Sequence, residues 1–312
     1  ARWLRASFIA IGFGLLAKGP VAVLVPLATT FIYCALKRDL KTWFRAVFDW
    51  RGIALMLVIA APWYAAQYAK EGDAFVRGFL MKHNVERFSA PMHGFDGSLF
   101  FYVPWLFGAT LPHVVPLLNA LRGIPRAWAD DLQRFCLIWF GFVFAFFSFS
   151  GTKLPHYVFY GYTGLFIVMA LQVPRLKSHA LALLPATLVF AALAALPFGL
   201  EAAIPGLRDA YYREALTDIR AQFGPAYYAC TALLVAGTIA LMRVTSIGLP
   251  AKLLATGAGM AAMFAVFILP IAGEAQQAPI KEAALLARAN NWHAVMYGLN
   301  TPSRSEEHTS EL

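Results

Sequence analysis

Charged residues are scarce in this sequence. Asp, Glu, Lys and Arg make up 14% of its 312 residues, whereas a soluble domain carries about 25%. Apolar residues make up 60%, the mean hydropathy is +0.60, and apolar runs of membrane-spanning length recur along almost the whole chain. This composition excludes an ordinary soluble enzyme and predicts an all-α polytopic membrane protein.

Cysteine is also rare. The three cysteines, Cys34, Cys136 and Cys230, lie far apart inside apolar runs and show no CxxC spacing. Neither a disulfide framework nor a thiolate metal site is therefore supported.

Acidic side chains are missing from the interiors of the apolar runs. Nine runs are long enough to cross a bilayer as helices, which satisfy their own backbone in lipid. They cover residues 3–17, 21–36, 53–68, 99–118, 135–149, 157–173, 181–200, 226–242 and 253–271. Lys and Arg occur only at the ends of these runs. Ion-coupled transport generally needs an ionisable group at mid-depth, so this absence weakens the hypothesis of a transporter.

Basic residues predict how the helices are oriented. Lys and Arg outnumber Asp and Glu by 26 − 17 = 9. The short loops on one side of the predicted membrane carry 14 basic and four acidic residues, and the longer loops on the other side carry 11 and 10 before residue 304. The short basic loops are cytoplasmic by the positive-inside rule. Because the basic excess is explained by orientation, no nucleic-acid partner is expected.

The long loops then face outward: residues 69–98, 150–156, 201–224 and everything after 272. Helical spacing of apolar residues in two of them predicts outer juxtamembrane helices near 73–88 and 207–223. We expect a transmembrane domain over residues 1–271, incomplete at its N-terminus, and the start of a periplasmic C-terminal domain at 272–303. Residues 304–312 read as a translated sequencing adapter.

Polar residues gather at the predicted outer membrane surface. Three outer segments carry them: Lys18-Gly19-Pro20, residues 82–93, and residues 152–157. Two interpretations stay open. The basic side chains extend to the lipid head groups, or they form a shared site for a phosphate whose lipid tail runs down between the helices.

The same segments resemble a known family. The motifs are KGP (18–20), APWY (61–64), HNVERF (83–88), His93, PW (104–105) and TKLPHY (152–157). Their order is similar to that in the polyprenyl-phosphate-sugar glycosyltransferases, above all the bacterial lipid A aminoarabinose transferases, which are relatives of the protein O-mannosyltransferases. The resemblance implies a GT-C fold with about nine transmembrane helices. It also implies transfer of a sugar from an undecaprenyl-phosphate-type carrier to a periplasmic acceptor, either a lipid such as lipid A or a protein.

The resemblance further implies roles for single residues. Four would hold the lipid phosphate: Lys18, Arg87, Lys153 and Tyr157. Two would ligate a divalent metal ion, the one cofactor expected: His83 and His93. Arginine offers a fork of donors that matches phosphate oxygens, and lysine offers a point charge.

The general base is expected upstream of residue 1. In the family the carboxylate that serves the acceptor hydroxyl lies in an outer loop near the N-terminus. The acidic residues of the first long outer loop here, Asp73, Glu86 and Asp96, do not match that position. We therefore name no catalytic base and expect this segment alone to be inactive.

Two other classes of function remain as alternatives: a transporter or flippase of lipid-linked saccharides, and a structural membrane subunit. Transport would need paired inverted halves and polar groups at mid-membrane, which are not found in the sequence. The expected location is the bacterial inner membrane, which the chain would cross several times, with its C-terminal domain in the periplasm.

Overall fold

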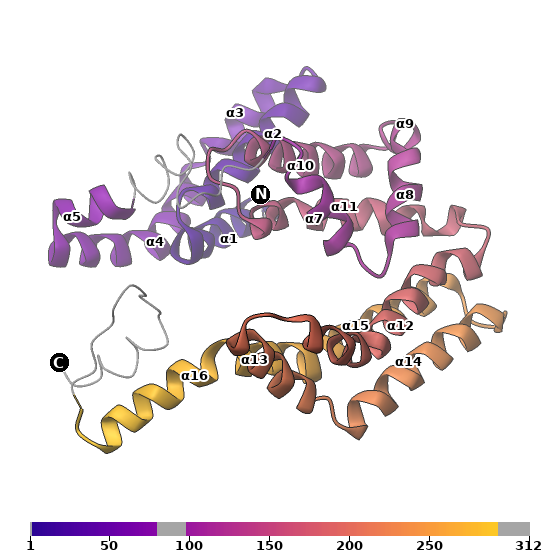
Figure 1. The fold of residues 1–312 in the computed structure, drawn as a ribbon. Coiled ribbons are helices and arrows are strands. Elements are labelled where there is room, and N and C mark those ends of the chain that lie inside the picture. The colour runs from indigo at the N-terminus through magenta and orange to yellow at the C-terminus, as the bar shows by residue number, and fades with distance from the viewer. Residues whose placement is uncertain (1, 80–97, 293–312) are drawn as a thin grey trace. The chain divides into compact units, whose positions relative to one another are not determined.

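The computed structural model describes residues 2–79 and 98–292 and, within them, contains helices and no strand. The helices form two compact units (Figure 1). The first unit comprises Ala1–Thr110 and Pro116–Leu176, and the second comprises Leu111–Val115 and Lys177–Leu312. Each unit is described by itself below.

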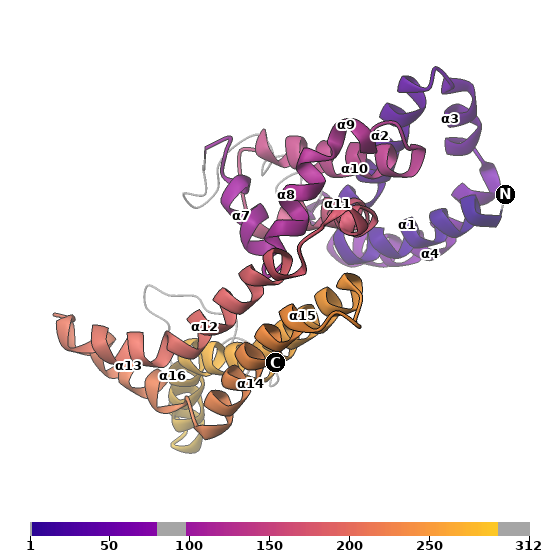
Figure 2. The ribbon, with the colours of Figure 1, turned by 90° about the vertical axis from the view of Figure 1, so that its right-hand side faces the viewer.

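The first unit is built from α-helices with short 3₁₀ turns. Its elements are α1 (Arg2–Lys18), α2 (Val21–Leu36), α3 (Leu40–Val47), α4 (Trp50–Glu71), α5 (Asp73–Phe75), α7 (Tyr102–Ala109), most of α8 (Val114–Arg122), α9 (Ile124–Ala127), α10 (Asp131–Ser148), η2 (Pro155–Val158), α11 (Phe159–Gln172) and η3 (Val173–Arg175). Helix α1 packs along α4, and α10 packs against both α11 and α2 (Figures 1 and 2). A core of fully buried side chains, including Tyr102, Leu117 and Val143, lies among α7, α8 and α10.

Two glycines let α11 approach α10 closely. A Cβ on Gly164 would lie 2.7 Å from the backbone oxygen of Cys136, and one on Gly161 would lie 3.0 Å from Cβ of Val143. Small residues at such crossings allow backbones to come together in membrane proteins, where packing rather than water exclusion drives association. The contact between α10 and α11 therefore depends on these two positions.

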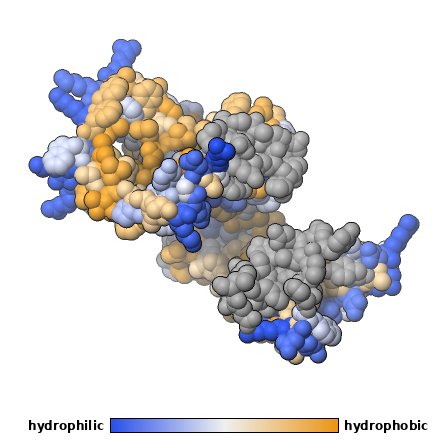
Figure 3. Space-filling view, turned by 90° about the vertical axis from the view of Figure 1, so that its left-hand side faces the viewer, coloured by the Kyte–Doolittle hydropathy of each residue, from blue (hydrophilic) through white to orange (hydrophobic). Residues whose placement is uncertain are grey.

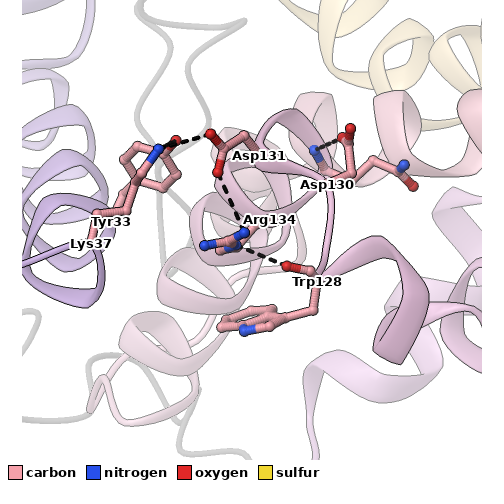
Figure 4. A network of polar contacts seen from close by, with 7 residues as sticks. Tyr33, Lys37, Trp128, Asp130, Asp131 and Arg134 are labelled. Atoms are coloured by element: carbon pink, nitrogen blue, oxygen red, sulfur yellow. Dashed lines mark hydrogen bonds and ion pairs between the residues drawn. The ribbon is translucent and has the colours of Figure 1, made fainter.

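A polar network joins the end of α2 to the start of α10 (Figure 4). The Lys37 ammonium lies 2.8 Å from Oδ2 of Asp131, and this hydrogen bond raises the pKa of Lys37. Arg134 pairs with Oδ1 of Asp131 at 3.4 Å and donates from Nε to the Trp128 carbonyl at 2.8 Å. The C-terminus of α2 therefore meets the N-terminus of α10, and since the two helices pack together they run antiparallel. The N-terminus of α2 and the C-terminus of α10 then lie together at the opposite end of the helix pair.

The second unit consists of α12 (His179–Ala203), η4 (Ile204–Gly206), α13 (Ala210–Ala221), α14 (Pro225–Arg243), α15 (Leu249–Met263), the π-helical turn η5 (Phe264–Ile268) and α16 (Leu269–Ala289). Its apolar core contains Phe223, Tyr227 and Met263, and the Tyr227 hydroxyl donates to the Leu193 carbonyl at 2.6 Å. Lys252 in α15 is fully buried. Its ammonium donates to the Val244 carbonyl that follows α14 and to Nδ1 of His179.

The structure confirms the predicted all-α polytopic membrane protein. Among residues 2–79 and 98–292, six helices are long and apolar enough to span a bilayer, namely Trp50–Glu71, Asp131–Ser148, Pro155–Arg175, His179–Gly206, Pro225–Arg243 and Leu249–Gln277, and Val21–Leu36 is a shorter apolar helix. Much of the visible surface is hydrophobic, with hydrophilic residues at its edges (Figure 3). Such a surface suits contact with lipid.

The expected span at residues 99–118 is wrong as a single helix. Two short helices, α7 and α8, occupy that range and are separated at Thr110–His113. The Thr110 hydroxyl donates to the Leu106 carbonyl at 2.9 Å at the end of α7, and Pro112 has no N–H with which to continue a helix. His113 then donates from Nε2 to the Leu253 carbonyl of α15 at 3.0 Å. The other eight predicted runs lie on continuous helical segments.

The segments predicted to lie outside the membrane are helical where they are described. Residues 73–79 form one to two helical turns, and α13 occupies Ala210–Ala221. Residues 80–88 lie outside the described residues. Helix α16 runs without a break through residues 272 and 279, so the start of a C-terminal domain at 272 stays a prediction.

Cysteine labelling tests the predicted orientation. In a variant without natural cysteines, we expect Thr42→Cys and Ala129→Cys to be shielded from an impermeant maleimide in intact cells, because both lie in basic, predicted cytoplasmic loops. Ala202→Cys and Gly206→Cys should react. All four positions are exposed in the structure, so burial does not explain a difference. Labelling of Thr42→Cys from outside would place the Lys153 turn on the cytoplasmic side.

Candidate lipid-phosphate site

The KGP motif forms the tight turn between α1 and α2. Lys18 ends α1 with an exposed side chain, and Gly19 has φ +80°. This left-handed conformation favours glycine. A Cβ on Gly19 would also lie 2.9 Å from Cζ of Phe79. The turn therefore needs glycine both for its backbone and to accommodate the Phe79 ring.

Four aromatic rings gather beside this turn. Phe75 and Phe79 stack with ring centroids 5.4 Å apart, and both pack against Trp63 and Tyr64 of the APWY motif at 5.8–6.2 Å. The Tyr64 hydroxyl donates to the Leu15 carbonyl of α1 at 3.0 Å. The structure thus joins the KGP turn, the APWY motif and the residues that precede 80–97.

The TKLPHY motif forms the turn between α10 and η2 and holds a buried lysine. Lys153 is only 7% exposed, and its ammonium donates to the Ser150 carbonyl at 2.8 Å. The Ser150 hydroxyl donates to the Thr152 carbonyl at 3.0 Å. Lysine has three N–H donors, and Lys153 forms no ion pair within the described part of the chain. A charge held this way suits an anionic ligand.

Tyr157 is also buried, at 9% exposure. Its ring lies 5.0 Å from that of Phe147 in α10 and 4.9 Å from that of His156. Tyr157, Leu154 and Val21 all belong to the core cluster around Tyr102 or pack against it. Together with the antiparallel pairing of α2 and α10, this places the Lys18 and Lys153 turns at the same end of the first unit.

The remaining predicted site residues lie outside the described residues. Arg87, His83 and His93 belong to 80–97. Their roles in binding phosphate and metal stay predictions. Across residues 2–79 and 98–292, no group of three or more His, Cys, Asp or Glu side chains could hold a metal ion.

Sequence reasoning missed two features of this end of the unit. Tyr102 is fully buried in the core cluster against which Leu154 of the TKLPHY turn packs, whereas the neighbouring Trp105, chosen as a motif residue, is 46% exposed. The docking of Phe79 onto Gly19 was also missed. The i, i+4 spacing of Phe75 and Phe79 marked an apolar face, but nothing local indicated its partner.

Known proteins share this fold. The chain superposes over 97% of its length on ArnT from Cupriavidus metallidurans bound to undecaprenyl phosphate, with a TM-score of 0.67 and 21% sequence identity, covering 54% of that protein. The apo form matches with a TM-score of 0.63. The GT-C fold predicted from the sequence is confirmed. The chain is a polytopic membrane protein with the ArnT fold.

Sequence relatives agree with this likeness. A Pseudomonas fluorescens undecaprenyl phosphate-alpha-4-amino-4-deoxy-L-arabinose arabinosyl transferase is 30% identical over 153 residues, which are 48% of this chain and 27% of that protein. The Pseudomonas aeruginosa enzyme of the same name is 33% identical over 155 residues, 48% of this chain and 27% of the relative. No family model matches the sequence. The chain thus aligns with only about a quarter of the length of these curated relatives and resembles the aminoarabinose transferases, as predicted.

Proposed function

We propose that the chain is part of a membrane glycosyltransferase that takes a sugar from an undecaprenyl-phosphate-type carrier. The similar proteins carry names of this activity, and one structure with the same fold holds undecaprenyl phosphate. Within the chain, the observation that carries the proposal is the buried Lys153 at the same end of the first unit as Lys18. A desolvated cation beside an apolar bundle suits a lipid-linked phosphate.

The two lysines would act with Arg87 and Tyr157 on the carrier phosphate. As the bond between sugar and phosphate breaks, negative charge grows on the phosphate oxygens, and cations fixed in advance stabilise that charge in the transition state. Burial strengthens the effect because the surrounding dielectric is low. Lys153 is held in place by Ser150 and needs no reordering when the donor arrives.

His83 and His93 would contribute to a divalent metal site beside the phosphate. A metal ion there would neutralise phosphate charge as a Lewis acid. Two histidines are fewer ligands than the three or four protein ligands usual for zinc, so further ligands would come from outside this chain segment or from the phosphate. The general base would lie in a segment upstream of residue 1.

The acceptor is proposed to be lipid A or a protein on the periplasmic face of the bacterial inner membrane. The support is the predicted orientation, which places Lys18 and Lys153 on the outer side, and the names of the relatives. The bilayer itself is the other partner, since the helices are apolar on their exposed faces.

A transfer assay tests the proposal. A full-length protein that carries this segment, reconstituted in nanodiscs with an undecaprenyl-phosphate-linked sugar and lipid A, should release undecaprenyl phosphate and yield glycosylated lipid A by mass spectrometry. A panel of donor sugars would establish which one is used. If the protein instead moved the intact donor across a vesicle bilayer without transfer, the proposal would be replaced by a flippase.

A further inference from the structure

Helix α3 is amphipathic. From the sequence, its residues are predicted only to form part of a basic cytoplasmic loop, and no helix is expected there. It lies within residues 37–49, the short link between the apolar helix α2 and the candidate membrane span α4. Since both neighbours are apolar helices and the link is short, α3 is held close to the bilayer surface on the predicted cytoplasmic side.

One edge of α3 is attached to α2. The Trp43 indole donates from Nε1 to the Thr30 hydroxyl at 3.1 Å, and its ring meets Phe31 edge-on at 5.1 Å. At the start of α3, the Asp39 side chain accepts from the Thr42 backbone N–H at 3.2 Å, and hydrogen bonding with Thr42 lowers the pKa of the Asp39 carboxyl. The helix therefore has a defined orientation.

The rest of its apolar face is exposed. Leu40, Phe44 and Phe48 follow one another at i, i+4 and i+8, with 38%, 50% and 68% of their surface accessible. The Phe44 and Phe48 rings stack with an interplanar angle of 5°. A preformed apolar stripe of this kind at a bilayer surface fits among the upper acyl chains.

Basic side chains border this stripe. Four are exposed and form no ion pair within the described residues: Arg38, Lys41, Arg45 and Arg51. The two acidic residues of the link cap the starts of helices: Asp39 accepts from the Thr42 N–H, and Asp49 accepts from the Gly52 N–H at 3.0 Å. With these four basic residues against the two carboxylates, the border of the stripe keeps a net charge of 4 − 2 = +2.

Arg38 adds a second, independent observation. Its φ is +56°, a left-handed conformation at the end of α2 where glycine is the usual residue. The Arg38 N–H donates to the Ala35 carbonyl at 3.0 Å and the Asp39 N–H to the Cys34 carbonyl at 2.9 Å, so the helix end itself needs no arginine. A charged side chain at a position that favours glycine is a reason to seek a function for the charge.

We propose that α3 and its flanking arginines bind anionic phospholipids of the cytoplasmic leaflet. Leu40, Phe44 and Phe48 would lie among the acyl chains, while the guanidinium and ammonium groups pair with lipid phosphates and anionic head groups. The position of α3 at the bilayer and the net positive charge along its apolar stripe favour a lipid surface over a protein partner.

The test compares lipids on the full chain. In neutral detergent, phosphatidylglycerol should raise the melting temperature and be retained in native mass spectra at concentrations where phosphatidylcholine has no effect. Each basic residue near an anionic surface changes the affinity about fivefold, so Lys41→Gln with Arg45→Gln should weaken phosphatidylglycerol binding by more than tenfold. Phe44→Ser with Phe48→Ser should also weaken phosphatidylglycerol binding, because it removes the apolar stripe that enters the acyl chains.

Two further variants complete the test. Arg208→Gln with Lys281→Gln, which removes two exposed charges in the second unit, should change binding less than twofold. Arg38→Gly should raise the melting temperature without lipid while lowering the shift caused by phosphatidylglycerol. The proposal would be overturned if both lipids raised the melting temperature equally. It would also be overturned if Lys41→Gln with Arg45→Gln lost no more phosphatidylglycerol affinity than Arg208→Gln with Lys281→Gln. Cross-linking of two copies through Phe48→Cys in nanodiscs would also overturn it, because a second copy would then cover the stripe.

Discussion

Replacing Lys153 by alanine in a full-length transferase that carries this segment should weaken donor binding by about 1.5–3 kcal/mol. This is the usual contribution of a hydrogen bond to a charged group. Lys153 is nearly buried and held by the Ser150 carbonyl, so its charge acts at a fixed point. Donor saturation curves at fixed acceptor concentration measure the effect, with the melting temperature recorded in parallel.

Matched variants separate phosphate binding from packing. Lys153→Met keeps the apolar stem and removes the charge, so it should lose as much donor affinity as Lys153→Ala with less loss of stability. Lys252→Met removes a second buried lysine, one bonded to Val244 and His179 in the other unit. It should lower the melting temperature and leave donor saturation unchanged. Unchanged donor curves for Lys153→Ala at normal expression would favour the alternative in which the side chain only reaches for lipid head groups.

The same assay applies to Arg87. Arg87→Ala should weaken donor use by a similar amount, and Arg87→Lys should restore only part of it, because an ammonium cannot make a two-pronged contact with phosphate. Full activity of Arg87→Lys would mean that the guanidinium fork is not used.

Gly164→Ala should destabilise the first unit by about 1–3 kcal/mol or more, the range for overpacked interiors. The added Cβ would lie 2.7 Å from the Cys136 backbone oxygen, and no side-chain rotation can relieve a clash with backbone. Helices α10 and α11 must therefore move apart. Thermal unfolding of the purified protein in detergent measures the loss.

Gly141→Ala provides the matched control. Gly141 lies in α10, and no atom lies within 4 Å of the position of its Cβ. Because alanine loses less conformational entropy than glycine when it enters a helix, this variant should be neutral or stabilising by up to about 1 kcal/mol. If both variants unfolded at the same temperature, the close approach of α10 and α11 would be refuted.

Several elements followed from local sequence alone. The cores of eight predicted spans lie on helices. A segment exposed to lipid must form all its backbone hydrogen bonds internally, so a long run of apolar residues directly predicts a helix. The fold class followed for the same reason. The order and spacing of the six motifs from KGP (18–20) to TKLPHY (152–157) predicted the likeness to aminoarabinose transferases.

Other elements depended on partners distant in sequence. The break at Thr110–His113 depends on His113 meeting the carbonyl of Leu253 in α15, a contact that no window of residues 99–118 contains. The α3 helix was not predicted, because its basic residues led to the segment being interpreted as a loop. Asp39 as an N-cap and the spacing of Leu40, Phe44 and Phe48 could have indicated it. The burial of Lys153 is a property of the tertiary structure, in which η2, directly after the turn, contacts both α10 and α7.

The sequence by itself determined that the chain is a membrane protein, roughly where its helices run, which loops are basic, and which family it resembles. Each of these depends on composition or on order along the chain. Only the tertiary structure decided that Phe79 lies on Gly19, that Lys153 is buried while Lys18 is exposed, and that the two lysine turns share one end of the first unit. Those outcomes depend on which helices pack together. Packing brings residues that are far apart in sequence into contact, and local hydropathy does not show which residues these are.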